Sequence, residues 1–445
     1  MSNIQELIRS IPLDRIALAD QTHTISYQNL IQLYYDNIDV INKLKGASVV
    51  INGRKRMEFA KLLTLLDGVA EKILFLPPDI DTSLHKKYYK EANISYEIYL
   101  ENDFLRYNKI SIVTNQSSEL GSTQWIIPTS GTTNTPKLIL HNYESLTRTV
   151  KRDLDIGKSF RWGLVFDIYR FSGIQVFLQS ILSGSKLIIT ESSQNMTDIL
   201  DILIKYNCNA LSATPSFWRK VLMSKKADKL QLRRITLGGE IADENILQAL
   251  KIKFPDAKIS HIYASTEVGV GFSVTDGHEG FPLSFLNGGL KNIKMKIDKE
   301  GLLWIAPVNK NQSYVSNENM YDKDGYINTG DIVKVRGKRV YFLGRNSGAI
   351  NIGGNKVQPE EVERTLLSSD LIAEAFVYAM KNPMMGSLVC ADVVLNNKEV
   401  DRNEVKKQLF KHCRERLESF KVPAMIKFVE EVQTTDSGKL KRGLK

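Results

Sequence analysis

The sequence predicts an α/β protein: a large N-terminal domain of layered, mostly parallel sheets and helices plus a β-rich subdomain, followed by a small α+β C-terminal domain. Three observations lead to this prediction. Apolar runs such as Ala47–Ile51 and Ile73–Leu76 alternate with helical patterns over residues 1–115. In the middle of the chain, strand-like runs end in loops of glycine and small polar residues. From residue 344 onward a separate αβ pattern begins.

Four strand-like runs in the middle region end in loops that carry hydroxyl, glycine or acidic side chains. They are Trp125–Ile127, Asn209–Leu211, Arg234–Leu237 and Ile259–Ile262. Helices are expected after the second and third runs, the latter with Asp243 near its N-cap. Ligands of open parallel sheets bind beyond the carboxyl ends of the strands. One such loop alone is an ordinary turn, but four of one type predict a shared pocket.

The last third of the chain predicts the β-rich part and the C-terminal domain. Residues 330–343 predict a β-hairpin with its turn at Gly337–Lys338, and a boundary near Gly344 divides the chain into domains 1–343 and 344–445. The C-terminal domain is expected to contain a helix from Pro359, strands at 374–378 and 388–394, a helix over about 402–418 and a strand around Ile426.

Composition bounds the class of protein. With 42% apolar and 25% charged residues the chain has the composition of a globular protein, and its net charge of +10 suits an anionic ligand. The lysines are scattered rather than arranged in a stripe, which argues against nucleic acid as a partner. No run approaches the roughly 20 apolar residues of a membrane span, and the N-terminus lacks the apolar core of a signal peptide. Three widely spaced cysteines (Cys208, Cys390, Cys413) indicate a reducing compartment, so a cytoplasmic protein is predicted.

The segment Thr129–Lys137 has the composition of a phosphate-binding loop. Its hydroxyl side chains include Thr129, Ser130, Thr132 and Thr133, and it also contains Gly131 and Lys137. Gly131 lets backbone N–H groups approach a phosphate chain closely, and Lys137 can pair with a terminal phosphate. The segment does not match the Walker pattern, Gly-x-x-x-x-Gly-Lys-[Ser/Thr]. A plain Ser/Thr-rich loop is the alternative.

This loop resembles the signature of the acyl-adenylate-forming (AMP-binding) superfamily, which includes acyl- and aryl-CoA ligases, peptide-synthetase adenylation domains and luciferases. Further motifs that resemble those of the superfamily occur in its order. They are Ile25–Leu30, Tyr263-Ala-Ser-Thr-Glu267, Thr329-Gly-Asp331, Gly344-Arg345 with Ile350–Glu363, and Thr435-Asp-Ser-Gly-Lys439. The resemblance spans nearly the whole chain.

The resemblance implies how a nucleotide would be held. Glu267 would hold Mg²⁺, a cation that prefers oxygen ligands, and Thr266 would contact the α-phosphate. Asp331 would accept hydrogen bonds from both ribose hydroxyls, and Arg345 would support the ribose or phosphate side. The residues that would line the adenine slot are Gly238, Gly239, Glu240 and Tyr263.

The resemblance also implies a mobile C-terminal domain that serves two half-reactions in turn. Lys439 would bridge the substrate carboxylate and the α-phosphate while negative charge builds there. Gly353 and Gly354 would flank the tunnel through which a pantetheine thiol arrives. The hinge position two residues after Arg345 is usually Asp or Lys in the superfamily, whereas this chain has Ser347.

A second departure concerns the acyl pocket. Residues 167–173 fall where many CoA ligases carry His-x-x-Gly, and here Arg170 replaces the histidine. If Arg170 faces the pocket, an acid with a polar or acidic substituent is favoured; the alternative is an arginine that points elsewhere in a salt bridge. The other candidate pocket residues are Gly173, Val268 and Gly271.

These features together predict an acid–thiol ligase that uses ATP and Mg²⁺ to make an acyl-adenylate and then a thioester. CoA is the expected acceptor, because Arg170-x-x-Gly173 keeps the spacing found in CoA ligases. One alternative is a stand-alone enzyme that loads the phosphopantetheine of an acyl or peptidyl carrier protein. Another is a catalytically silent nucleotide-binding regulatory protein, against which Glu267, Asp331 and Lys439 argue.

Overall fold

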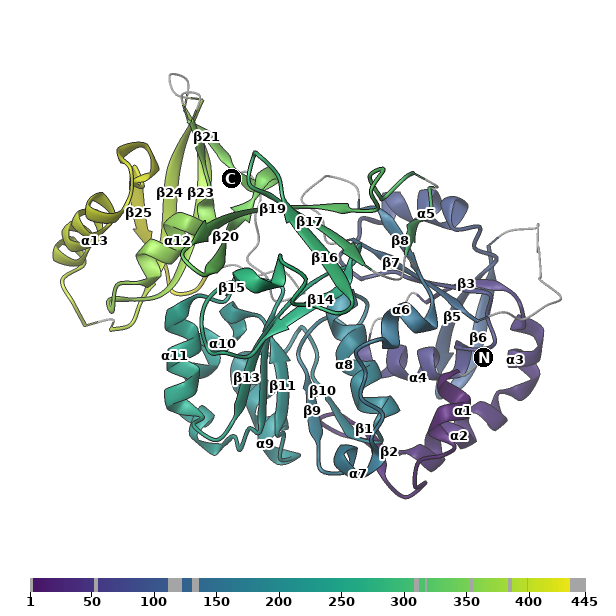
Figure 1. Ribbon diagram of the computed structural model, residues 1–445. Coiled ribbons are helices and arrows are strands. Elements are labelled where there is room, and N and C mark those ends of the chain that lie inside the picture. The colour runs from purple at the N-terminus through teal and green to yellow at the C-terminus, as the bar shows by residue number, and fades with distance from the viewer. Residues whose placement is uncertain are drawn as a thin grey trace.

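The computed structural model describes residues 3–51, 55–110, 122–129, 136–307, 312–316, 318–352, 355–382, 386–397 and 399–432. Figure 1 shows a large lobe, which runs from α1 to β20, and a small lobe, which contains α12, α13 and β21 to β25. The helices of the large lobe are α1 (Ile4–Ile8), α2 (Tyr27–Asp36), α3 (Ile38–Leu44), α4 (Arg56–Leu66), α5 (His85–Glu91), α6 (Tyr143–Thr147), α7 (Leu154–Gly157), α8 (Phe171–Leu182), α9 (Met196–Lys205), α10 (Pro215–Met223) and α11 (Glu244–Lys253).

The first sheet of the large lobe has the order β14-β13-β12-β11-β9-β10-β1-β2. Its strands pair in parallel from β13 to β1, and an antiparallel strand closes each edge. The strands are β1 (Ile16–Ala19), β2 (Thr24–Ser26), β9 (Arg161–Leu164), β10 (Lys186–Ile189), β11 (Ala210–Ala213), β12 (Arg234–Gly238), β13 (Lys258–Ser265) and β14 (Gly269–Val274).

The second sheet has the order β18-β8-β7-β4-β3-β5-β6, and its central strands β7, β4, β3 and β5 are parallel. The prediction of layered, mostly parallel sheets is therefore confirmed. The strands are β3 (Ser48–Ile51), β4 (Lys72–Phe75), β5 (Tyr96–Glu101), β6 (Phe104–Lys109), β7 (Gln124–Pro128), β8 (Leu138–His141) and β18 (Ser313–Tyr314).

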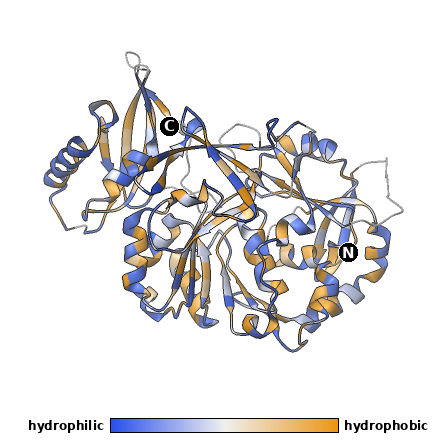
Figure 2. Cartoon of the chain, in the orientation of Figure 1, coloured by the Kyte–Doolittle hydropathy of each residue, from blue (hydrophilic) through white to orange (hydrophobic). Residues whose placement is uncertain are grey.

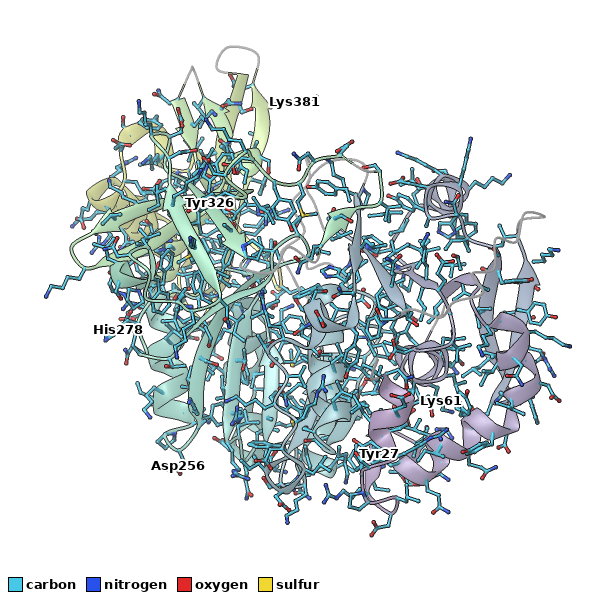
Figure 3. The ribbon with its side chains drawn as sticks, turned by 45° about the vertical axis from the view of Figure 1, so that its right-hand side comes forward. Tyr27, Lys61, Asp256, His278, Tyr326 and Lys381 are labelled. Atoms are coloured by element: carbon cyan, nitrogen blue, oxygen red, sulfur yellow. The ribbon has the colours of Figure 1, made fainter. Side chains whose placement is uncertain are left out.

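The two sheets share one hydrophobic core, with α4 and α8 between them (Figure 1). Both helices are apolar around most of their circumference, which is typical of a helix covered on several sides. Tyr27 belongs to the same core, and its hydroxyl donates to the carbonyl oxygens of Ile181 and Ser185 at 3.1 and 3.0 Å. This side chain lies inside the large lobe (Figure 3), so the Ile25–Leu30 motif anchors α2 to the end of α8.

The predicted β-rich subdomain is the sheet β15-β20-β19-β17-β16. The hairpin turn lies at Gly337–Lys338 as predicted, with Gly337 at φ +58°. The strands are β15 (Phe281–Pro282), β16 (Ile293–Ile297), β17 (Leu302–Pro307), β19 (Ile327–Arg336) and β20 (Arg339–Arg345).

The small lobe has a core of its own, to which its helices and sheets contribute. Its exposed helix α13 is mostly polar (Figure 2) and buries Val405, Leu409 and Cys413. The elements are α12 (Pro359–Leu367), α13 (Arg402–Arg416), the pair β21 (Ile350–Ile352) and β22 (Asn355–Val357), and the sheet of β23 (Ile372–Asn382), β24 (Gly386–Leu395) and β25 (Met425–Phe428). The predicted elements of the C-terminal domain thus occur at their predicted positions. Within the described part of the chain, we find no helix with the length and apolarity needed to cross a membrane.

Candidate active site

A cleft of about 650 Å³ lies where the small lobe meets the large one. Its walls come from the loops after β7, β12 and β13, from the N-termini of α8 and α10, and from α12 and β23 of the small lobe. The volume falls within the range of small-molecule sites, roughly 300–1,000 Å³. The four strand ends singled out in the sequence therefore meet at one pocket, although β7 belongs to one sheet and β11, β12 and β13 to the other.

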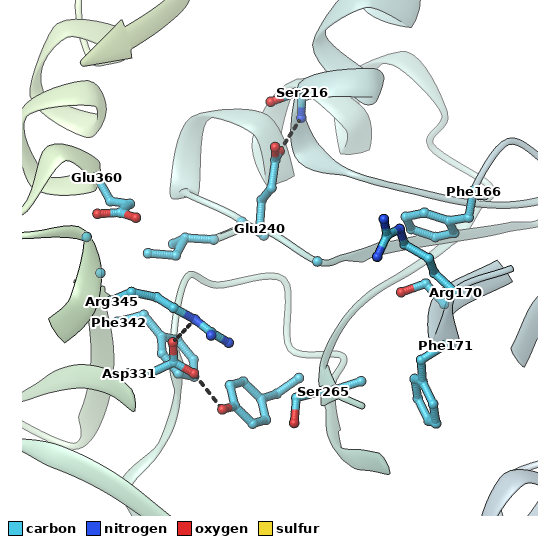
Figure 4. A pocket seen from close by; sticks show the side chains of 18 of the residues that line it. Phe166, Arg170, Phe171, Ser216, Glu240, Ser265, Asp331, Phe342, Arg345 and Glu360 are labelled. Carbon is cyan, nitrogen blue, oxygen red and sulfur yellow. Dashed lines mark hydrogen bonds and ion pairs between the residues drawn. The ribbon is translucent and has the colours of Figure 1, made fainter. Parts of the chain in front are cut away.

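Two groups of side chains lie at opposite ends of this cleft (Figure 4). We call the first, built around Tyr263, Asp331 and Arg345, the Asp331 end. We call the second, built around Phe166, Arg170 and Phe171, the Arg170 end.

The Asp331 end is a connected polar network. The Tyr263 hydroxyl donates to Asp331 Oδ2 at 2.6 Å, and Arg345 Nε pairs with Asp331 Oδ1 at 3.1 Å (Figure 4). Burial raises the pKa of the Asp331 carboxyl, an effect that Arg345 and the Tyr263 hydrogen bond oppose. The Tyr263 ring is stacked parallel to Phe272 and Phe342, with ring centroids 5.3 Å apart in each pair.

The hairpin register places Asp331 beside Arg345. The two residues are direct partners across β19 and β20, and a register shift between Ile332 and Val333 aligns them. Without that irregularity the pairing dictated by the turn at Gly337 would be offset by one residue, which changes the face that a side chain occupies.

The loop after β12 contributes Gly239 and Glu240. Gly239 has φ +81°, a conformation that side-chain-bearing residues rarely adopt, and it lines the cleft. Glu240 Oε2 accepts a hydrogen bond from the backbone N–H of Ser216 at 3.0 Å, at the N-terminus of α10 (Figure 4). A carboxylate in that position is stabilised by the unpaired N–H groups of the helix.

The turn between β13 and β14 contributes Ser265, Thr266 and Glu267 to the cleft wall. Ser265 Oγ accepts the backbone N–H of Val268 at 3.1 Å and so fixes the turn. Thr266 is 9% exposed, whereas Glu267 is half-buried. We find no hydrogen bond or ion pair between the Glu267 carboxylate and any described residue.

His141 lies beneath this turn and was not singled out from the sequence. The imidazole is fully buried, its Nδ1 is 3.3 Å from Ser145 Oγ, and its ring is 5.6 Å from that of Phe171. Burial lowers its pKa to about 3, against a weaker effect of the Thr266 backbone, so the ring is neutral at physiological pH. A lone histidine in a strand carries no signal that would have predicted this position.

Thr129 and Lys137 close the base of the predicted phosphate loop. Thr129 N–H donates to the carbonyl oxygen of Lys137 at 2.8 Å, and Lys137 N–H donates to Thr129 Oγ1 at 3.1 Å. Lys137 Nζ pairs with Glu318 at 2.8 Å, which raises the lysine pKa, and lies 4.6 Å from the centroid of the Tyr314 ring. Thr129 lines the cleft, whereas Lys137 stands outside its wall, held by Glu318. Predicted residues Ser130, Gly131, Thr132, Thr133, Gly353, Gly354 and Lys439 lie outside the described residues.

Arg170 faces the cleft, as the first alternative held, and it also forms salt bridges, which the second alternative had expected only for a side chain pointing elsewhere. It lines the cleft between Phe166 and Phe171 (Figure 4), and its Nη2 donates to both oxygens of Asp79 at 2.6 Å. Its Nε lies 3.6 Å from Asp167 Oδ2. Asp79 follows β4, in a loop that shows no functional pattern in its sequence.

The other predicted pocket residues do not line the cleft wall. Gly173 packs against the loop before α8: a Cβ there would lie 2.2 Å from the carbonyl oxygen of Asp167. Val268 is fully buried in the core beneath the β-rich sheet. Gly271 lies beside Tyr263, where a Cβ would be 3.1 Å from the ring. Gly238 is the last residue of β12, one position before the cleft begins.

Comparison with known proteins identifies the family. The model of the AMP-binding enzyme family matches residues 37–304, more than half of the chain, and that of the AMP-binding enzyme C-terminal domain matches residues 361–439. The chain belongs to the AMP-binding enzyme family. The chain is 25% identical to the 2-succinylbenzoate–CoA ligase of Bacillus velezensis, with 96% of this chain and 94% of the relative covered. It is also 25% identical to the D-alanine–D-alanyl carrier protein ligase of Staphylococcus aureus, with 72% and 70% covered.

A solved structure with this fold is the o-succinylbenzoate CoA synthetase of Bacillus subtilis in complex with its acyl-adenylate intermediate. The TM-score is 0.71 at 19% identity, over 99% of this chain and 97% of that one. The predicted fold is confirmed. Membership of the AMP-binding enzyme family, together with these relatives, also confirms the predicted class of enzyme, an AMP-forming acid–thiol ligase.

This AMP-binding enzyme has a polar seam between its lobes that the sequence did not indicate. Arg364 Nε of α12 pairs with Glu279 of the large lobe at 2.9 Å, and Arg364 Nη2 donates to the carbonyl oxygen of Phe342 at 2.5 Å. Asn245 Nδ2 donates to the carbonyl oxygen of Leu367 at 2.9 Å. Gly344, at φ +149°, gives α12 room, because a Cβ there would lie 2.3 Å from Glu360. These contacts hold α12 against the Asp331 end.

Proposed function

We propose that the cleft binds ATP at the Asp331 end and a carboxylic acid at the Arg170 end, and that the enzyme passes the acyl group from AMP to CoA. The observation that carries this proposal is the convergence of Asp331, Arg345, Glu240 and Glu267 on one cleft of about 650 Å³. Adenylation requires the substrate carboxylate to attack the α-phosphorus while pyrophosphate leaves. A cleft with a polar network at one end and aromatic walls at the other can align both reactants.

At the Asp331 end we assign Asp331 to the ribose hydroxyls. Each of its oxygens has one partner in the structure and retains a lone pair for a further hydrogen bond. Arg345 lowers the pKa of this carboxyl against the larger effect of burial, and it would contact the ribose or the phosphates. The adenine slot would be lined by Tyr263, Gly239 and Glu240. Gly238 would fix where the loop after β12 begins, and Thr266 would contact the α-phosphate.

Mg²⁺ is assigned to Glu267. Its carboxylate faces the cleft without a described hydrogen-bond partner, and no group of three or more metal-ligating side chains occurs among the described residues. Mg²⁺ typically takes one or two carboxylates and completes its coordination with phosphates and water, so a single acid suits a nucleotide-borne ion. When bound, the ion would neutralise phosphate charge. Lys137 would exchange Glu318 for a phosphate of the same nucleotide.

Lys439 is assigned to the bridge between the substrate carboxylate and the α-phosphate. Support comes from the place of its motif at the end of the small lobe, whose α12 and β23 already line the cleft. We expect thioester formation to use another arrangement of the lobes, since no described residue of β21 or β22, the strands before and after Gly353 and Gly354 in the sequence, lines the cleft. We place the lobe boundary at 343/344, within the last residues of β20.

The acid that fits the Arg170 end has an aryl or similarly apolar body and a hydrogen-bond acceptor. Phe166 and Phe171 supply the apolar walls, and Arg170 supplies the donor. 2-Succinylbenzoate, the acid named for several relatives, carries two carboxylates and belongs in the panel of acids to be tested.

A carrier protein is the alternative acceptor, favoured by the similarity to a D-alanyl carrier protein ligase and by the net charge of +10. Salt-sensitive binding of an acidic carrier would support it. Cytoplasmic residence is proposed from the three free, buried cysteines.

The test is ATP–pyrophosphate exchange across aryl, short-chain and long-chain acids, followed by thioester formation with CoA. Exchange that depends on one class of acid is expected. A folded protein that binds ATP but exchanges pyrophosphate with no acid would instead be a silent nucleotide-binding protein.

A further inference from the structure

The Arg170 guanidinium has unused donors. Its Nη2 is saturated by the two oxygens of Asp79, each at 2.6 Å. Its Nε faces Asp167 at 3.6 Å, beyond hydrogen-bond distance, and Nη1 is buried without a partner in the described part of the chain. A buried donor without an acceptor costs free energy. A ligand oxygen that reaches Nη1 from the cleft would satisfy one of its two N–H groups.

The charge of the Arg170 guanidinium is shared with two carboxylates. Asp79 and Asp167 flank it, and the charge of Arg56 also acts on Asp167. Asp79 and Asp167 both line the cleft, but the Asp79 side chain is 32% exposed and that of Asp167 only 6%. A ligand group that reaches Nη1 therefore comes close to the negative charge of Asp79.

The effect of Asp79 on binding depends on the charge of the ligand. A neutral carbonyl, amide or hydroxyl oxygen can accept from Nη1 and leave the Arg170–Asp79 pair intact. A second carboxylate would be repelled by Asp79 or would have to displace it, which strands a carboxylate in a poorly solvated wall. Like charges a few ångströms apart at an intermediate dielectric repel by an amount worth a factor of ten or more in affinity, as an order-of-magnitude estimate.

We propose that Asp79 is a specificity-determining residue, through which the Arg170 end selects acids with a neutral hydrogen-bond acceptor over acids with a second carboxylate. This inference rests on the proposed function, because it needs the acid to bind at the Arg170 end. If the Asp79–Arg170 pair served only to hold the loop after β4 against the start of α8, its loss would affect all acids alike.

The experiment compares matched acids in the wild type and in Asp79→Asn. The pairs are 4-carbamoylbenzoate with terephthalate, and succinamate with succinate. The readout is the ratio of kcat/KM values in pyrophosphate exchange within each pair. The wild type is expected to favour the amide at least about tenfold, and Asp79→Asn to shift the ratio toward the dicarboxylate by about tenfold or more.

Asp81→Asn is the matched control. It removes the same charge two residues away on the same cleft wall, where the carboxylate accepts the N–H of Ser83 rather than pairing with Arg170, and asparagine can also cap that turn. The ratio should not change. Asp79→Ser serves as a second variant, with thermal melting to verify folding of each protein.

An amide-to-carboxylate ratio that stays within about twofold of wild type in both Asp79 variants would overturn the inference and leave the proposed function standing. An enzyme that already prefers the dicarboxylate would overturn it as well. If the folded wild type exchanges pyrophosphate with none of the wider panel of acids, the proposed function itself fails, and this outcome is distinct from an unchanged ratio.

Discussion

The two ends of the cleft differ in how their charges are arranged. At the Asp331 end a single buried carboxylate is shared by a tyrosine and an arginine, and Glu240 is fixed on a helix N-terminus. At the Arg170 end a single arginine is shared by two carboxylates and stands between aromatic rings. The first arrangement suits a constant ligand with hydroxyls and phosphates. The second arrangement leaves N–H donors of Arg170 open, which suits an acid with a neutral hydrogen-bond acceptor.

The largest effect is expected from Lys439→Ala. This variant removes the cation that we assign to the bridge between the substrate carboxylate and the α-phosphate. Adenylation should fall by at least about 10²–10³-fold, because preorganised positive charge at a developing negative charge is worth that much. Thioester formation from supplied acyl-adenylate should largely survive. Lys441→Ala, on the same tail, is the control; equal loss in both half-reactions of the Lys439 variant would contradict its assignment.

Asp331→Asn tests the Asp331 end alone. The variant keeps the shape of the side chain but loses the ion pair with Arg345 and the charge that would accept the ribose hydroxyls. KM for ATP should rise about 10- to 100-fold, as for the loss of a charged hydrogen-bonding group. The preference among acids should not change. The exposed Asp324→Asn variant should behave as wild type in both measurements, and a changed acid preference in Asp331→Asn would mean that the two ends are not independent.

A smaller effect is expected when the seam between the lobes is weakened. Arg364→Met leaves Glu279 unpaired, and the adenylating arrangement should become less populated because opening the lobes hydrates that acid. We expect adenylation to fall roughly 3- to 10-fold, with thioester formation from supplied acyl-adenylate unchanged or faster. Lys421→Met, which breaks ion pairs within the small lobe, is the control.

Adding Glu279→Gln to Arg364→Met should recover part of the lost rate, because no buried charge then remains unpaired. The prediction is contradicted if Arg364→Met slows adenylation and thioester formation equally, and no more than Lys421→Met does. The contacts between the lobes would then not favour adenylation selectively.

The last prediction concerns pH. Burial raises the pKa of Asp331, so its carboxylate becomes protonated at a higher pH than an ordinary aspartate would. Protonation removes the acceptor for the ribose, and adenosine binding should therefore weaken as pH falls, by up to about tenfold per pH unit once the pH is below that pKa. Adenosine is the probe because it carries no ionisable phosphate. Titration calorimetry measures the effect, and pH-independent binding down to the onset of unfolding would contradict it.

The sequence anticipated the Asp331 end better than the Arg170 end. Tyr263, Asp331 and Arg345 sit in ordered motifs, and the hairpin turn at Gly337 could be read from the chain, so their proximity was predictable. The register shift that aligns Asp331 with Arg345 was not, because a bulge leaves little trace in composition. Asp79 could not be foreseen either, since its contact with Arg170 joins two sheets across 91 residues.

The role of Gly173, close to the Arg170 end, could not be predicted from the sequence either. Gly173 looked like a pocket residue, yet its missing side chain serves the close packing of α8 against Asp167. Whether a glycine opens a pocket or permits a contact depends on the neighbour it faces, and that neighbour is set by tertiary packing. The Arg364–Glu279 pair was hidden for a similar reason, because it exists only once the lobes have met.

The central claim is that one cleft between two lobes joins an organic acid to AMP and then releases it to CoA. Mass spectrometry of a single turnover tests this most directly, with enzyme in excess over the acid that supports the fastest exchange. Acyl-AMP is expected to accumulate on the enzyme when CoA is absent and to convert to acyl-CoA when CoA is added. Acyl-CoA that forms without any acyl-AMP, or ATP that is bound and never converted, would contradict it.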